Sequence, residues 1–204
     1  MTDRSEAVEV AERGQDRLPA VLRRLSDRRD DVAEDARGIA RAEAELGVRL
    51  PRDYAEFIGE FGGGEIDEFA AVVIPYAPDL PGLPSSVVSC TETVREALSA
   101  ARGTISRFRA EQLICWGSDS DYDYLWYTAD ADLDNWPVVL MANPAEMVEL
   151  DCGMAEFLMR ALTGQLPEPF THRWFGDPAT FLHWREARRR AGVGQPEWDV
   201  WCSG

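Results

Sequence analysis

Two runs of alternating aspartates are the residues in this chain that most resemble a site for chemistry. Both runs have the pattern D-x-D-x-D, and their members are Asp119, Asp121 and Asp123, then Asp130, Asp132 and Asp134. Oxygen ligands at positions 1, 3 and 5 open a calcium loop, which then requires glycine at position 6 and glutamate at position 12. The first run has Tyr124 and Asp130 at those two positions, and the second has Asn135 and Met141. We therefore interpret both runs as acidic turns in solvent, and we predict no bound metal or other cofactor.

Aromatic side chains lie between and beside the aspartates. They are Tyr122, Tyr124, Trp126, Tyr127 and Trp136. Tyrosine and tryptophan are enriched at protein interfaces, and aromatics ringed by aspartates suit a partner that presents arginine or lysine over an apolar patch. The alternative is that these aromatics fill the core, because an antiparallel sheet commonly buries one face. The candidate partner-binding residues are Asp119, Asp121, Tyr122, Asp123, Asp130, Asp132, Asp134 and Trp136.

Catalytic arrangements find little support in the sequence. Ser118 lacks the second glycine of a G-x-S-x-G nucleophile elbow. Both histidines, His172 and His183, lie in the tail, where we interpret them as ordinary, partly buried residues. We predict that the protein is not an enzyme; a metal-dependent hydrolase that uses the aspartates is the alternative.

The cysteines are scattered and include no C-x-x-C pair. They are Cys90, Cys115, Cys152 and Cys202. In a chain without a secretion signal, such cysteines are more often free, partly buried thiols than members of a disulfide or a zinc site. We therefore expect free thiols.

The net charge of −16 is concentrated in the middle of the chain. Residues 53–159 hold 20 acidic residues and 4 arginines, whereas the two flanks together hold 17 of each. Residues 110–159 contain no basic residue at all. Direct binding to nucleic acid is disfavoured, because phosphates need basic partners. A basic protein partner is favoured, because complementary fields speed encounter and select partners; acidity that only keeps the protein soluble is the alternative.

Two helices joined by a turn are predicted within residues 38–66. The first helix ends at Gly47, since glycine readily adopts the left-handed conformation that stops a helix. Pro51 suits the first turn of the second helix, and Gly62–Gly64 ends it without the lysine of a phosphate loop. The apolar face of the second helix, at helical spacing, consists of Tyr54, Phe57, Ile58 and Phe61.

A β-rich centre follows these helices. Residues 69–74 are predicted as a buried strand, and Ser89 with Glu92 as the capping box of a helix to about residue 102. Short acidic connections then favour an antiparallel meander. Its predicted strands are 112–116, 122–127 and 136–142, with an edge strand over 147–150.

The end of the chain is predicted to be mainly helical. A helix over 151–162 ends at Gly164. Asp177–Pro178 is predicted to open another helix, which continues through Phe181, Leu182 and Trp184 to Arg190. Residues 198–202 are expected to place an aromatic strand against the core.

Two segments resemble the SUKH superfamily, the Smi/Knr-like domain. The first follows the pattern E-x-x-LG-x-x-LP, then D-Y-x-x-F and a glycine run, with Glu43, Leu46, Gly47, Leu50, Pro51, Asp53, Tyr54, Phe57 and Gly62 to Gly64. The second, Trp116 to Leu125, is similar to the G-S-D-x-x-G-D-Y block of these domains, with Tyr122 near the place of the expected glycine. The resemblance implies a non-enzymatic α+β domain. In bacteria such domains act mostly as immunity proteins that neutralise partner toxins, often nucleases, and in fungi relatives regulate cell-wall assembly.

We therefore predict an α+β fold, with an antiparallel or mixed central sheet flanked by N- and C-terminal helices. The predicted divisions are a charged helical extension over 1–37, with an amphipathic helix around 19–29, a SUKH-like domain over 38–164, and a helical tail over 165–204 packed on the domain. The N-terminus is charged throughout and lacks the apolar core of a signal peptide, and the chain has no run of about 18 apolar residues. We expect a cytoplasmic protein that does not enter the membrane.

The resulting hypothesis is an immunity protein that binds a basic toxin domain through its acidic turns. The alternative is a regulatory or scaffold domain with an endogenous partner.

Overall fold

The computed structural model describes residues 22, 32–77, 85–101, 107–128, 130–167, 175 and 179–192. Among these residues, helices and an antiparallel sheet of seven strands form one α+β domain, as predicted. The helices are α2 (Val32–Leu46), α3 (Arg52–Phe61), α4 (Val87–Ala100), α5 (Met154–Leu162) and α6 (Trp184–Arg190). The strands are β1 (Gly64–Ile66), β2 (Ala70–Val72), β3 (Leu113–Ser118), β4 (Asp123–Tyr127), β5 (Val138–Asn143), β6 (Glu146–Leu150) and β7 (Phe181–His183).

The strand order is β6-β5-β4-β3-β2-β1-β7, and every pair of neighbours is antiparallel. The predicted meander is confirmed as β3, β4 and β5, with β6 as the predicted edge strand. The opposite outer strand, β7, comes from the far end of the chain and pairs with β1 from Gly64↔His183 to Ile66↔Phe181. The sheet is therefore closed on this side by residues more than a hundred positions away in sequence.

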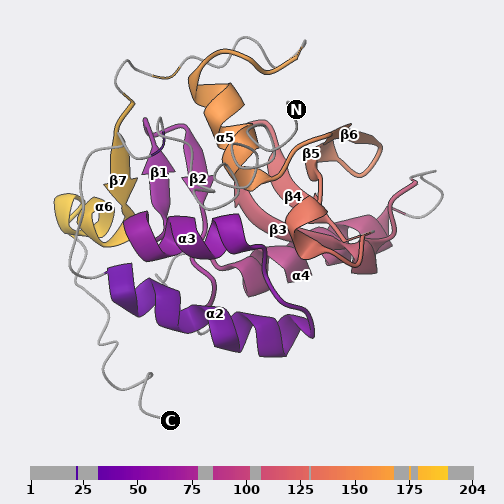
Figure 1. Ribbon diagram of the computed structural model, residues 1–204, viewed down its shortest axis with the longest axis horizontal. Helices are drawn as coiled ribbons and strands as arrows, with labels where there is room; N and C mark the ends of the chain where they lie inside the picture. Colours follow the sequence, from indigo (N-terminus) through magenta and orange to yellow (C-terminus); the bar gives the residue numbers. More distant parts are fainter. Residues whose placement is uncertain are drawn as a thin grey trace, which may run out of the picture.

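One face of the sheet is covered by α3 and α5, and α2 packs beside α3 (Figure 1). The apolar face of α3 is buried as its spacing predicts. Tyr54 meets Trp126 edge-on, with ring centroids 5.2 Å apart, and Phe157 of α5 contacts Trp116 at 5.8 Å. This main core holds the alternate residues of β3 and β4 that point toward α3 and α5.

The other face of the sheet is also covered over its central strands. Val94 of α4 packs in a second core with Cys115, Leu125 and Val139, the residues that alternate with those of the main core. The expectation that the sheet buries one face is therefore wrong for β3, β4 and β5. Helix α4 supplies the second apolar layer, so these strands carry apolar residues at successive positions instead of alternating.

The predicted helix–turn–helix corner is confirmed, and its contacts explain the spacing of its residues. Gly47 has φ of 72°, and its N–H donates to the Glu43 carbonyl at 2.9 Å. The Glu43 carboxylate then reaches across the turn and accepts from the Leu50 N–H at 3.0 Å. Glu43 thus fixes the chain between α2 and α3, and α3 begins one residue after Pro51.

Three predicted elements have different limits. The buried strand is shorter, Ala70–Val72, and Ile74 makes only an isolated bridge with Ser86. Ser86 is the N-cap of α4 and forms a capping box with Ser89, so the box expected at Ser89 and Glu92 is wrong by one turn.

The helix predicted through Phe181 and Leu182 is wrong at its start, because residues 181–183 form β7 and the helix begins at Trp184. Pairing with β1 and burial of Phe181 against Phe57 and Phe61 outweigh the local helical pattern.

Several expectations fall on residues outside the described ranges. They are the helix around 19–29 apart from the buried Leu22, the Asp177–Pro178 start signal, His172, Cys202 and the strand over 198–202.

The turn between β1 and β2 contains two consecutive residues in the left-handed region, Asp67 with φ of 51° and Glu68 with φ of 57°. Asparagine or glycine usually fills such hairpin turns, because a Cβ atom is disfavoured there. The Asp67 carboxylate offsets part of this cost by accepting from the Thr180 N–H at 2.7 Å and the Thr180 hydroxyl at 2.8 Å. Glu68 is exposed.

Replacing Glu68 with glycine should raise the free energy of unfolding by about 1 kcal/mol, because glycine adopts this conformation without strain. Urea unfolding followed by circular dichroism measures the change. Asp67→Gly is the matched control, and it should be destabilising because it removes the bonds to Thr180. A lower stability for Glu68→Gly would contradict the assignment of strain to this turn.

Candidate functional site

The turn between β3 and β4 is held together by the carboxylate of Asp119. One oxygen accepts from the Asp121 N–H at 2.7 Å and from the Tyr122 N–H at 2.8 Å, and the other accepts from the Tyr124 hydroxyl. Asp121 is exposed, whereas Tyr122 and Asp123 are half-buried. Burial raises the pKa of Asp123 above its ordinary value. Asp119 therefore shapes this turn, and Asp121 is its outermost carboxylate.

The connection between β4 and β5 is built in the same way. Asp130 accepts from the Asp132 N–H at 2.8 Å, and Asp132 accepts from the Asp134 N–H at 3.2 Å. The indole N–H of Trp136 donates to the Asp130 carbonyl at 2.9 Å, and Trp136 is buried beneath the turn. Asp130 and Asp132 are exposed, and Asp134 is half-buried.

These contacts give a physical account of the alternating aspartates. An aspartate side chain commonly accepts from the backbone N–H two residues later, so aspartates at every second position form successive Asx turns. Within the described residues, no group of three or more His, Cys, Asp or Glu side chains could hold a metal ion. The D-x-D spacing thus follows from backbone hydrogen bonding.

The two acidic turns lie at opposite ends of β4. Its five residues, Asp123–Tyr127, separate the turns by about 13 Å along the strand. The sequence places all six aspartates within one short segment, but the structure divides them into two groups.

The Asp130–Asp134 turn lies where α3 and α5 begin. The Arg52 N–H donates to the Asp134 carboxylate at 3.1 Å. Asp53 accepts from the Ala155 N–H at 2.9 Å and so caps α5 from the first turn of α3. We define the acidic end of the molecule as Asp130, Asp132, Asp134, Asp151 and Glu156.

The carboxylates of the acidic end affect the pKa of Cys152, which is buried beneath them. Burial raises the pKa of Cys152 to about 11; Arg160 lowers it, and Glu156, Asp151 and Asp53 raise it further. Arg160 itself is bound to Glu156 at 2.5 Å. Carboxylates therefore outnumber the basic group around Cys152.

The aromatic candidates are mostly core residues. Tyr124, Trp126 and Trp136 are buried, while Tyr122 and Tyr127 are half-buried. Tyr122 packs against the main core, and Tyr127 meets Phe108 edge-on at 5.0 Å in the second core. At both turns the outermost side chains among the predicted site residues are aspartates.

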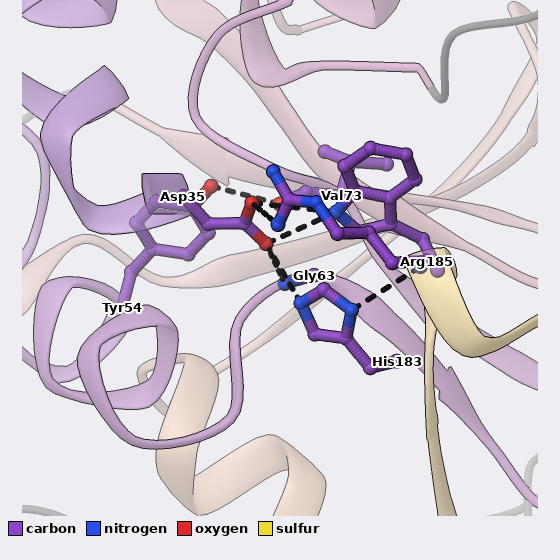
Figure 2. A network of polar contacts seen from close by, with 7 residues as sticks. Asp35, Tyr54, Gly63, Val73, His183 and Arg185 are labelled. Atoms are coloured by element: carbon purple, nitrogen blue, oxygen red, sulfur yellow. Dashed lines mark hydrogen bonds and ion pairs between the residues drawn. The ribbon is translucent and has the colours of Figure 1, made fainter. Parts of the chain in front are cut away.

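A buried polar network that the sequence did not indicate joins both ends of the domain (Figure 2). Asp35 of α2 accepts from the Gly63 N–H at 3.0 Å and from Arg185 at 3.1 Å. His183 lies 3.1 Å from the same carboxylate, and the Trp184 indole donates to it at 3.1 Å. The side chain of Asp35 is 0% exposed and that of His183 is 1% exposed. The expectation that His183 is only partly buried is therefore wrong.

This network explains the first glycine of the Gly62–Gly64 run. Gly62 has φ of 72°, and a Cβ atom there would lie 2.5 Å from His183 Nε2 and 2.8 Å from Asp35. Any larger residue would collide with the network as well as adopt a strained backbone. The network holds an acid, an imidazole and a guanidinium together, but burial keeps this carboxylate and this imidazole from a substrate, so we interpret it as structural.

A pocket of about 380 Å³ lies beside α6, over the strands β1 and β2. Its charged lining residues are Glu65 and Arg188. No histidine or cysteine occurs among the described residues that line it.

Comparison with known proteins identifies the family. Residues 35–160 match the SMI1 / KNR4 family model (SUKH-1). The chain belongs to this family. SUKH domains are generally non-enzymatic binding domains, and they include immunity proteins to polymorphic toxins. No curated protein and no solved structure gives a significant match. None of the helices in the described part of this SUKH-1 chain has the length and hydropathy needed to cross a membrane.

The SUKH-1 match begins at Asp35 itself, whereas β7 and α6 lie beyond its end. The acidic turns and the helix–turn–helix corner lie inside the match. In this SUKH-1 chain, then, the first matched residue forms the anchor for a strand and a helix that follow the matched region.

Asp35→Asn should lower the free energy of unfolding by about 3 kcal/mol, because the change removes the buried charge that faces Arg185. Chemical unfolding measures the difference. Glu45→Gln, an exposed change on the same helix, should alter stability by less than about 0.5 kcal/mol. Equal effects of the two changes would show that the network is not a principal support of the fold.

Asp123 yields a prediction about pH. Its pKa is raised in the folded state by burial, so the folded protein favours the protonated carboxyl more than the unfolded chain does. At a pH below its ordinary pKa, Asp123 therefore contributes favourably to the free energy of folding. That contribution is lost as the pH rises through the pKa of Asp123 in the folded state. Asp123→Asn should raise the thermal midpoint at pH 7, and the gain should shrink as the pH is lowered to 4. Asp121→Asn, two residues away and exposed, is the matched control and should raise the thermal midpoint less; a larger gain than that of Asp123→Asn would contradict the assignment to burial.

Proposed function

We propose that this chain is an immunity protein that binds a basic toxin domain through its acidic end and blocks that domain's active site. The observation that carries the proposal is the gathering of exposed carboxylates at the N-terminal ends of α3 and α5. Asp130, Asp132, Asp151 and Glu156 are all exposed there, in a segment from 110 to 159 that contains no basic residue. Family membership supports a binding role of this kind.

The backbone beneath the acidic end is held in a defined geometry. The Asx turns fix the chain from Asp130 to Asp134, and Trp136 anchors that turn from below. Asp53 ties the start of α3 to the start of α5. A surface whose backbone is already ordered loses little conformational entropy on binding, which favours tight association.

The mechanism needs no bond-making step from this chain. A surface with a net excess of one charge attracts a partner of the opposite sign over about one Debye length, roughly 8 Å at physiological ionic strength. Carboxylates that face arginine or lysine then fix the orientation of the complex. Neutralisation follows from steric occlusion of the toxin domain's active site.

The predicted partner-binding residues have separate roles in this proposal. Asp130, Asp132 and Asp134 supply charge, and Trp136 positions them. Asp121 and Asp123, at the far end of β4, form a second and smaller contact, with Asp119 and Tyr122 shaping their turn. A partner that reaches both groups has to extend along the strands.

The double change Asp130→Asn and Asp132→Asn should slow association with the cognate toxin domain about fivefold at low ionic strength, because it removes two exposed charges. Stopped-flow mixing with the product of the adjacent gene measures the rate. Raising the salt concentration should slow wild-type association and reduce the difference between the two proteins.

Glu92→Gln with Glu96→Gln is the matched control, because it removes the same charge from exposed positions of α4. The control should associate nearly as fast as the wild type. If both double variants slow association equally, steering is a property of net charge and not of the acidic end. If the adjacent gene product does not bind but an endogenous protein does, the regulatory alternative is correct.

A further inference from the structure

Two thiols lie in the second core, between α4 and the sheet. Cys90 lies at the end of the first turn of α4, and Cys115 lies at the middle of β3. Both belong to the second core, in which Cys115 is buried and Cys90 is half-buried. The described cysteines Cys90, Cys115 and Cys152 are all free thiols.

Helix and strand approach closely at this point because small polar residues line the contact. The Cys115 N–H of β3 donates to the Thr91 hydroxyl of α4 at 2.9 Å. Only the short side chain of Thr91 therefore separates the backbone of α4 from the backbone of β3. Thr91 is the residue next to Cys90. A disulfide requires Cα atoms about 4.4–6.8 Å apart, a range that only such a close approach provides.

The pKa of Cys115 agrees with this close approach of α4 and β3. Interaction with the side chain of Cys90, and then burial, raises the pKa of Cys115 well above its ordinary value. The Cys90 thiol also donates to the Ser86 carbonyl at 2.8 Å, within the first turn of α4. The Cys115 thiol donates to the Gly117 carbonyl at 3.5 Å, so each thiol is ordered by its own element, on the two sides of the close contact between α4 and β3.

We propose that Cys90 and Cys115 form an oxidisable thiol pair, a modification site that links α4 to β3 through a disulfide. The oxidant is a peroxide, which reaches the half-buried Cys90 first. The peroxide converts the Cys90 thiol to a sulfenic acid and is itself reduced to water. The Cys115 sulfur then attacks the sulfenic sulfur, an S–S bond forms, and the oxygen leaves as a second water.

We expect this pair to be oxidised more slowly than the cysteines of a dedicated redox centre. Thiolates are the reactive species, and the raised pKa of Cys115 keeps it as a thiol at neutral pH. We therefore expect slow oxidation. The third described thiol, Cys152, lies beneath the acidic end in the main core, not in the second core that holds the pair.

The test is peptide mapping of the folded protein after hydrogen peroxide treatment and alkylation of free thiols. Trypsin cleaves after arginine, so Cys90 falls in the peptide 53–95 and Cys115 in the peptide 110–160. The second peptide also contains Cys152, so the experiment uses the Cys152→Ser protein. We expect a linked peptide lighter by two hydrogen atoms than the sum of the two, and its loss after reduction with dithiothreitol.

Cys90→Ser and Cys115→Ser in the same background should each abolish the linked peptide. The same treatment in 8 M urea should give much less of it, because only the fold holds the two thiols together. A folded protein in which both cysteines are fully alkylated after peroxide treatment would overturn the proposal. Equal linkage in folded and unfolded protein would overturn it too, because the fold would then contribute nothing.

Discussion

The buried carboxylate of Asp35 is the interaction on which the rest of the structure depends. It accepts from Gly63, Trp184 and Arg185 and contacts His183, and so joins α2, the end of α3 and the C-terminal β7–α6 segment. Removing an ionised carboxylate from water costs several kcal/mol, and strong partners must offset that cost. Because the cost is recovered only when all the elements are assembled, the network couples the two ends of the domain. Breaking one contact leaves the remaining charges poorly compensated.

The buried network of Asp35 and the acidic end proposed to bind a partner lie in different parts of the molecule. The network lies at the β1–β7 side of the sheet, whereas the acidic end lies where α3 and α5 begin (Figure 1). Helix α3 links the two, because Gly62 at its end borders the network and Asp53 in its first turn caps α5. The acidic residues are therefore exposed without being loosely held. Their charges repel one another and disfavour folding, and the buried core and network outweigh that repulsion.

Local pattern predicted most of the elements but few of the long-range contacts. The apolar spacing of α3, the glycine at Gly47 and the meander of β3 to β5 follow from period and turn chemistry, and the structure has them. The separation of the two acidic turns, which the sequence pattern assigns to one partner-binding set, also follows from antiparallel pairing, because successive turns of a meander lie at opposite ends of the strand between them. Asp35 could not be identified, because the side chains that it contacts are 148 to 150 residues away and nothing local marks an aspartate in an amphipathic helix as buried. The local pattern predicts helix for residues 181–183, because three residues beside a helical segment carry too weak a β pattern, and pairing with β1 decides their conformation.

The two outer strands of the described sheet determine how readily another chain can add to its edges. An unpaired strand edge is a template for pairing with another chain, so long, flat, apolar edges promote aggregation. Strand β7 is three residues long and leads directly into a helix, which leaves little edge to extend. Strand β6 is longer but carries Glu146 and Glu149, and Glu149 holds Arg107 at 2.9 Å. A second copy brought against β6 would set glutamates beside glutamates, so the same excess of acid that suits a basic partner also keeps copies of the protein from adding to one another's sheets.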